Sequence, residues 1–446
     1  MAKPRTLLLL LLALFPVAPF SVVLLRELRG IPMFDDFQAL IFFAVNFQQL
    51  HGLIPKFLYA ISAQHDEYKL IFEHLLVGLQ LTLSPHIHYR FLAILGDLFV
   101  FATLAVYWGG YFADLPLDRR LLRFAPISFL LVQLNYVETL DWAMCGLQMI
   151  PVIFFTLLSL YLVATPRSGD RWRFTLACIS GGLACLASAN GFILGPVGLL
   201  LLLQQRAFRR MSGWCISFAL AFTANLYGYH PITREAVVHP TILQKLIFFL
   251  TYLGAAVENM HHFPVYGGAM VLGTVILLIW LYSIRVGYHR THPFAFYAVL
   301  WILVCAAGVA QVRSKLGLDL SLSLRYKIYS DMLMIFVYGF AVNRVDERIV
   351  KRLSASKPAR LRAMYAAALL FVFLLNLSSA LFGYKFLKHR ADTYLTGFRD
   401  YQADPQHVSP EVSLSAEPIT TAEPEFSRKV MNEAIAKGIF VPPANP

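Results

Sequence analysis

The sequence predicts an all-α membrane protein with about eleven transmembrane helices and one large loop after the first of them. Hydrophobic residues make up 58% of its 446 positions and charged residues only 14%, whereas soluble domains are about one quarter charged. Several apolar runs reach the roughly 20 residues that a helix needs to cross a bilayer. Because these runs are continuous and not alternating, they exclude a transmembrane β-barrel.

The first predicted span begins as a signal peptide would, with Lys3 and Arg5 before a leucine-rich run. No small-residue cleavage site follows, and the apolar run continues to Leu25, so we expect an uncleaved span. Three later spans are short and should end at polar turns that protein or a cavity covers. The predicted spans cover residues 7–25, 90–112, 124–136, 146–164, 174–189, 191–204, 213–228, 267–284, 294–312, 326–343 and 364–385.

Basic residues gather in alternate connections between the spans, which indicates the cytoplasmic side of the membrane. The N-terminus falls on the same side, and the C-terminus falls on the other. The net charge of +12 does not indicate nucleic acid binding, because these short basic loops are typical of orientation signals and of contacts to membrane lipids. The cytoplasmic connections contain Arg119, Arg120 and Arg123; Arg167, Arg171 and Arg173; Arg206, Arg209 and Arg210; Arg285 and Arg290; and the basic residues from Arg344 to Arg362.

Composition divides the chain into a transmembrane domain, residues 1–386, and a polar tail, residues 387–446. Within the first part, residues 26–89 form the large extracytoplasmic loop, called loop one below, which should contain interfacial helices. Residues 243–257 are apolar but too short for a span, and we expect an interfacial or re-entrant helix there. The tail is too polar for a core of its own and should contain a short helix near residues 425–437.

Loop one contains two acidic clusters. Asp35 and Asp36 precede an apolar stretch, residues 37–45, that reads as an amphipathic helix on the membrane surface. One carboxylate could cap this helix. Alternatively, one could act as a general base, or as a metal ligand, that activates an acceptor hydroxyl.

The second cluster of loop one spans residues 64–69 and contains Asp66, Glu67 and Lys69. Its simplest interpretation is the solvated start of a helix with ion pairs along one face. A metal site formed by His65, Asp66 and His74 would match no established ligand spacing. The five cysteines show no metal-ligand spacing either, and we predict no metal ligand.

Three more polar segments lie on the extracytoplasmic side. Glu138 and Trp142 belong to a turn between spans, and Gln148 follows it. The turn could be a loop that the tryptophan anchors at the membrane interface. Alternatively, its polar side chains could form a pocket for a sugar or a pyrophosphate. Asn190 precedes a glycine, the strongest turn dipeptide. Arg313 and Arg325, the latter followed by Tyr326, bracket another loop. These arginines could clamp a phosphate through the guanidinium fork or could simply reach the lipid interface.

Four motifs occur in a fixed order between about residues 30 and 330: Gln-His-Asp-Glu-Tyr-Lys at 64–69, Glu138 to Gln148, Ser-Ala-Asn-Gly at 188–191, and Arg-Ser with Ser-Leu-Arg-Tyr at 313–326. Together they resemble a family of bacterial integral membrane proteins of the GT-C glycosyltransferase superfamily. Asp66 and Tyr68 depart from the asparagine and histidine of that pattern, and the turn at Glu138 is longer. The resemblance implies the inner membrane, a polyprenyl-phosphate sugar donor, an outer-face active site, an essential carboxylate in loop one and, in some members, a divalent cation.

We therefore expect an inverting glycosyltransferase that moves a sugar from a polyprenyl-phosphate donor to a lipid-linked or surface glycan. A transporter or flippase for lipid-linked saccharides is one alternative, although its spans should carry more polar groups than the single Asp97 at depth. A polymerase or ligase of surface polysaccharide would share the substrates. The catalytic candidates are Asp35, Asp36 and Glu67, and the substrate-binding candidates are Gln64, His65, Asp66, Lys69, Glu138, Trp142, Gln148, Asn190, Arg313, Arg325 and Tyr326.

Overall fold

A computed structural model of the chain describes residues 4–165, 171–232, 239–258, 266–352, 358–406 and 424–442. The predicted basic connection at Arg167 and part of the polar tail, residues 407–423, lie outside these ranges. Apart from one bridge between His65 and Tyr68, the regular structure of the described residues is helical. The all-α class is therefore confirmed.

Within the described ranges, five helices are long and apolar enough to cross a membrane. They are α6 (Tyr89–Gly110), α9 (Ala143–Ala164), α14 (Tyr266–Arg285), α16 (Pro293–Arg313) and a long part of α18 (Pro358–Ala403). A sixth span results if α1 (Pro4–Leu14) and α2 (Val17–Glu27), which are bent by 41°, count as one. The prediction of a helical membrane protein is supported by these helices.

The other predicted spans coincide with helices that are shorter or less apolar. Leu-rich α11 reaches only 11 residues, and α7 starts with two arginines in its first turn and contains Pro126. Helix α17 combines an apolar first half with a charged second half. These helices are α7 (Leu117–Leu131), α10 (Arg171–Ala187), α11 (Leu194–Gln204), α12 (Phe208–Leu226) and α17 (Lys327–Arg352).

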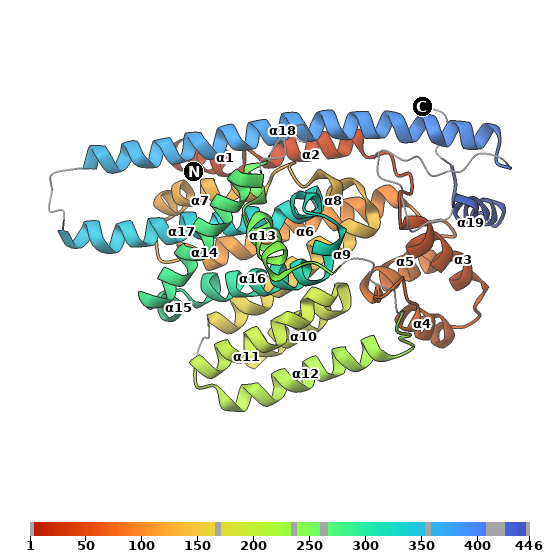
Figure 1. Cartoon of the computed structure of the whole chain (residues 1–446), viewed down its shortest axis with the longest axis horizontal. Coiled ribbons are helices and arrows are strands. Elements are labelled where there is room, and N and C mark those ends of the chain that lie inside the picture. Colours follow the sequence, from red (N-terminus) through yellow and green to blue (C-terminus); the bar gives the residue numbers. More distant parts are fainter. Residues whose placement is uncertain are drawn as a thin grey trace.

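The long helices lie side by side along the longest axis of the molecule (Figure 1). Helices α3 (Phe42–Gln49), α4 (Leu53–Ser62), α5 (Ile71–Leu83) and α19 (Pro424–Ala436) gather at one end, called the loop-one end below. Helix α15 (Tyr288–Thr291), the last turns of α17 and the first turns of α18 lie at the opposite end. This arrangement separates loop one from most of the basic connections by the length of the bundle.

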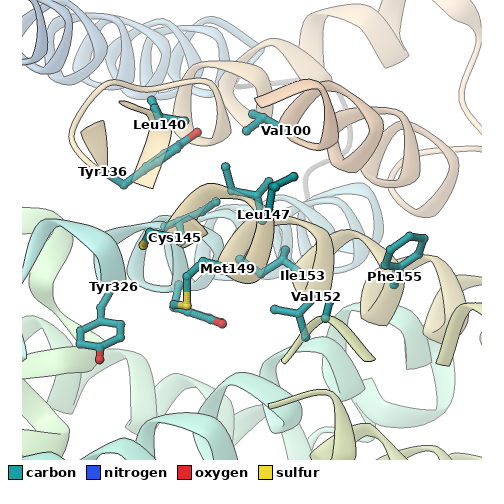
Figure 2. Close-up of a cluster of buried hydrophobic side chains, with 14 of the residues drawn as sticks. Val100, Tyr136, Leu140, Cys145, Leu147, Met149, Val152, Ile153, Phe155 and Tyr326 are labelled. Atoms are coloured by element: carbon teal, nitrogen blue, oxygen red, sulfur yellow. The ribbon is translucent and has the colours of Figure 1, made fainter. Parts of the chain in front are cut away.

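The core of the bundle surrounds α9, which is buried along most of its length. Figure 2 shows Leu147, Val152 and Ile153 of α9 among buried side chains from neighbouring segments. Helices α6 and α9 approach closely where two glycines meet, since a Cβ on Gly96 would lie 3.1 Å from the carbonyl carbon of Gly146. Such small-residue crossings let membrane helices pack backbone against backbone.

Loop one folds into helices that differ in part from those predicted. The predicted helix at residues 37–45 is a π-helical turn, η1 (Phe37–Ile41), that continues into α3. The prediction that the second acidic cluster begins a helix is wrong, because His65 and Tyr68 close a tight turn and α5 starts only at Ile71. Helix α4 exposes apolar side chains, as an interfacial helix does: Leu53 is 76% and Ile54 73% exposed.

Two further predicted segments are helical. Helix α13 (Ile242–Leu253) occupies the expected short apolar segment and is followed by η3 (Ala255–Val257). Helix α19 coincides with the short helix expected in the tail. It packs on loop one, with the rings of Phe42 and Phe426 5.5 Å apart and the Ile87 N–H donating to the Ile439 carbonyl at 2.8 Å. Because α18 continues without a break through residue 387, the tail begins inside a helix and joins the loop-one end.

Candidate functional site

Asp36 connects loop one to the bundle. Its side chain is fully buried, and its two carboxylate oxygens accept the backbone N–H groups of Met33 at 3.0 Å and Met144, in the first turn of α9, at 3.1 Å. Asp36 occupies the N-cap position of η1, but its side chain makes no capping hydrogen bond, so it does not cap the helix in the way that the sequence suggested for one of the two carboxylates. Burial raises the pKa of Asp36 to about 7, although the two backbone hydrogen bonds oppose this shift.

The raised pKa of Asp36 predicts a pH-dependent stability. The folded chain holds this proton more tightly than the unfolded chain, whose pKa is near 3.8, so its contribution to stability falls as the pH rises from 3.8 to about 7. Asp36→Asn does not titrate. The difference in thermal midpoint between wild type and Asp36→Asn, measured in detergent from pH 4 to 8, should therefore shrink with rising pH. A difference that is constant or grows would contradict this account.

The neighbouring Asp35 is more exposed than Asp36. Its side chain is 22% exposed, and Oδ2 lies 3.8 Å from Nε2 of His65, too far for a hydrogen bond but close enough for a charge interaction. The imidazole of His65 is almost fully buried, and neither ring nitrogen has a hydrogen-bond partner among the described residues. Asp35 thus presents a carboxylate at the surface of loop one beside an imidazole, the pairing that general acid–base chemistry uses.

A tight turn carries His65 to this position. The backbones of His65 and Tyr68 exchange two hydrogen bonds, of 3.0 and 3.1 Å, across the turn. Asp66 has a φ of +47°, in the left-handed region that aspartate tolerates better than most residues. Glu67 is half-buried, and its carbonyl accepts the hydroxyl of Tyr229 at 3.2 Å. Backbone hydrogen bonds therefore hold the turn.

Gln64 and Lys69 fasten this turn to the segment after α12. The Gln64 amide donates to the Asp66 carbonyl at 2.6 Å and exchanges hydrogen bonds with the backbone of His230 at 2.7 and 2.8 Å. The Lys69 ammonium donates to the carbonyls of Ser62 and Tyr227. Both side chains thus take part in holding the turn in place.

Arg313 and Arg325 reach the same turn from the far part of the sequence. Arg313 ends α16, and the chain then passes through η4 (Ser314–Leu316), η5 (Asp319–Leu322) and η6 (Leu324–Tyr326) into α17. Burial and the charge of Asp35 raise the pKa of Tyr68, whereas the charges of Arg313 and Arg325 oppose this shift. Both arginines and the loop-one carboxylate therefore lie near enough to Tyr68 for their charges to act on it.

Glu138 joins this cluster from α8 (Val137–Asp141). The Ser323 hydroxyl donates to Glu138 Oε2 at 3.5 Å, and the Thr139 hydroxyl donates to the Arg325 carbonyl at 3.4 Å. The guanidinium of Arg325 lies 5.3 Å from the ring of Tyr326, and its Nε has no hydrogen-bond partner among the described residues. Helix α8 and η6 thus hold a half-buried arginine beside the loop-one turn.

Two of the other predicted binding residues make aromatic contacts. The Trp142 ring lies 4.9 Å from that of Phe34, and the Tyr326 ring lies 5.4 Å from that of Tyr252. The structure places Gln148 half-buried on α9.

Asn190 also belongs to the packing around α16 and α17. Its amide donates to the Tyr329 hydroxyl at 3.4 Å, and its carbonyl accepts the Trp301 indole N–H at 3.0 Å. The neighbouring Gly191 is required by space, because a Cβ there would lie 2.2 Å from the Ala184 backbone. The predicted turn at this point is the 3₁₀-helix η2 (Ala189–Ile193).

The sequence analysis missed a buried ion pair beside the site. Arg390 of α18 lies 2.9 Å from Asp141 of α8, and its guanidinium lies 4.9 Å from the ring of Phe34 in loop one. Asp141 belongs to the polar turn singled out above, but Arg390 lies in the tail, and no spacing connects residues 249 positions apart. Tyr68 was noted only because it departs from a motif, and its position near the charges of Asp35, Arg313 and Arg325 was not predicted.

The metal site that was considered for loop one, formed by His65, Asp66 and His74, has no support in the structure. Within the described ranges, no three His, Cys, Asp or Glu side chains come together in a way that could hold a metal ion. His74 lies 3.1 Å from the Ala39 carbonyl through Nε2, and its ring stacks on Phe43 at 4.1 Å. These contacts hold the His74 ring against Ala39 and Phe43.

The cluster brings together a surface carboxylate, an imidazole and two guanidinium groups. A carboxylate beside an imidazole can accept a proton, and two guanidinium groups can bind phosphate oxygens. No protein-family model matches the chain, and no curated protein matches it. A functional assignment therefore depends on the geometry of Asp35, His65, Arg313 and Arg325.

Proposed function

We propose that the chain is a membrane glycosyltransferase of the GT-C type, which moves a sugar from a polyprenyl-phosphate donor to a lipid-linked or surface glycan. The observation that carries this proposal is that the charges of Asp35, Arg313 and Arg325 all act on Tyr68, although Asp35 lies 278 and 290 positions before the two arginines. A base and a phosphate clamp are the two parts that such a transfer requires.

The reaction is a single displacement. Asp35 accepts the proton of an acceptor hydroxyl, whose oxygen attacks the anomeric carbon of the donor while the bond from that carbon to the phosphate oxygen breaks. Arg313 and Arg325 stabilise the negative charge that develops on the departing polyprenyl phosphate. Because the attack occurs opposite the leaving group, the anomeric configuration inverts. The imidazole of His65 lies 3.8 Å from the Asp35 carboxylate.

The proposal includes a topology. We place the chain in a bacterial inner membrane with eleven spans, in which α7, α10, α11, α12 and α17 complete the six that are long and apolar. The loop-one end and the C-terminus face outward, and the N-terminus is cytoplasmic. The arginines of the opposite end, among them Arg119 and Arg209, support this orientation.

Cysteine labelling tests this topology. After the five native cysteines are replaced, a membrane-impermeant thiol reagent applied to intact cells should label Lys429→Cys, an exposed residue of α19. It should not label Arg209→Cys, an exposed residue of α12, until the cells are permeabilised. The reverse pattern would place loop one in the cytoplasm and would exclude an outer-face site.

Substitution of the two arginines tests the phosphate clamp. A guanidinium makes two parallel hydrogen bonds to phosphate, whereas lysine offers a point charge. Arg325→Lys and Arg313→Lys should therefore fold normally but bind a polyprenyl-phosphate hexose more weakly, by about 1–3 kcal/mol. Lys315→Arg, in the exposed turn between them, is the matched control and should bind as wild type does. Unchanged donor affinity in both lysine variants would remove the clamp from the mechanism.

The product separates the proposed activity from its alternatives. Purified chain in proteoliposomes should attach one sugar to the acceptor and release polyprenyl phosphate. A polymerase or ligase would transfer longer glycans from the same class of lipid, and a transporter would move the donor across the bilayer without releasing polyprenyl phosphate.

A further inference from the structure

A cavity of about 380 Å³ opens at the opposite end of the bundle, far from the cluster described above. It lies where α6 and α9 end, where α16 begins and beside the second half of α17 (Figure 1). This volume falls in the range of small-molecule sites. The mechanism proposed for the loop-one end makes no use of the cavity.

Aromatic side chains form one wall of the cavity. Phe112 has a φ of +56°, which is rare for a bulky residue and marks a position that its surroundings determine. Gly110 leaves room for the ring of Phe294, since a Cβ there would lie 2.3 Å from that ring. Tyr288 stacks on His292 at 4.4 Å, and its hydroxyl accepts the Asn343 amide at 3.0 Å. The wall is thus built from fixed rings.

The charged and hydrogen-bonding groups of the cavity favour an anion. Arg123 lines it, with its guanidinium 6.0 Å from the Phe112 ring, and His292 lines it from the start of α16. Phe294 and Ala295, in the first turn of α16, also line it, and first-turn N–H groups have no acceptor within their own helix. The cavity lining also includes the carboxylate of Asp114. This side chain is exposed, and its charge acts on Arg120.

We propose that this cavity binds a phosphate ester. The phosphate contacts Arg123 and the first turn of α16, and the organic part packs against Phe112 and Phe294. Such an ester has two sources, the headgroup of an anionic membrane phospholipid and a soluble phosphorylated metabolite. The inference does not depend on the proposed glycosyltransferase activity, because it concerns residues at the other end of the bundle.

Binding to the purified full-length chain tests the proposal. Native mass spectrometry would compare retained phosphatidylglycerol with phosphatidylcholine, and titration with glycerol 3-phosphate would follow the soluble source. Arg123→Gln should weaken binding of the preferred probe about 10- to 100-fold, as expected for the loss of a charged hydrogen bond. Arg119→Gln, an exposed arginine of the same helix that does not line the cavity, should bind as wild type does.

A second variant separates loss of charge from loss of fold. Ala113→Trp fills the mouth of the cavity at an exposed position and leaves every charge in place, so it should also abolish binding. Retention of phosphatidylglycerol alone supports the lipid source, and binding of glycerol 3-phosphate supports the soluble one. Absence of phosphate-dependent binding, or wild-type binding by both Arg123→Gln and Ala113→Trp, would overturn the proposal.

Discussion

Asp35→Asn is expected to lower sugar transfer by about 100-fold or more, the usual effect of removing a general base. Asparagine keeps the size of the side chain but cannot accept the proton of the acceptor hydroxyl. The Asp35 side chain is partly exposed. The local hydrogen bonds, from the N–H groups of Gln38 and Ala39, go to its backbone carbonyl, which the substitution keeps. Folding should therefore be unaffected. Release of polyprenyl phosphate by the purified variant, measured beside its thermal midpoint, checks both statements.

Two neighbouring carboxylates serve as controls for Asp35. Glu67→Gln should retain most of the activity, because Glu67 contacts its surroundings through its backbone carbonyl. Asp36→Asn should instead lose stability, because a buried asparagine cannot accept both backbone N–H groups. A wild-type rate for Asp35→Asn together with an inactive, folded Glu67→Gln would move the base to Glu67. Wild-type rates in all three variants would remove loop one from the chemistry.

Arg390→Met is expected to destabilise the fold by about 3–5 kcal/mol, the cost of leaving a buried charge without its partner. The pair with Asp141 is 2.9 Å long, and both side chains are buried. The same guanidinium covers Phe34, so its loss should also loosen loop one beside Asp35. Thermal unfolding in detergent, with proteolysis of loop one as a second readout, measures the effect.

An exposed ion pair provides the matched control for Arg390. Lys437 and Glu433 form a pair of 2.6 Å on α19, and such surface pairs contribute about 0–1 kcal/mol. Lys437→Met should therefore unfold close to the wild-type midpoint. Replacing both members, as in Asp141→Leu with Arg390→Met, should recover much of the stability lost in the single variant. If Arg390→Met unfolds at the same temperature as Lys437→Met, the buried pair of Arg390 and Asp141 does not stabilise the fold as predicted.

The fold was predictable where local pattern determines it. Continuous apolar runs specify α6, α9, α14 and α16, because a bilayer core accepts only segments that satisfy their own backbone hydrogen bonds. The turn from His65 to Tyr68 was wrongly predicted as a helix start. Its geometry depends on anchors that Gln64 and Lys69 make to residues about 160 positions away, and no local pattern records such contacts.

The candidate site was predictable in its chemistry and not in its assembly. Asp35, Arg313 and Arg325 were singled out because carboxylates and guanidinium groups suit this reaction at a membrane surface. The division of labour between Asp35 and Asp36 follows from burial, which two adjacent and identical side chains do not reveal. The support from Arg390 depends on the continuation of α18 past residue 386, and only the folded chain brings Arg390 to Asp141.

A structure with a non-hydrolysable polyprenyl-phosphate sugar bound would test the central claim most directly. The account predicts that the phosphate lies within hydrogen-bonding distance of Arg313 and Arg325, at the loop-one end. It also predicts that the anomeric carbon faces Asp35, with room for an acceptor hydroxyl between them. A donor whose phosphate lies at the opposite end of the bundle, or whose sugar faces away from Asp35, would contradict the account.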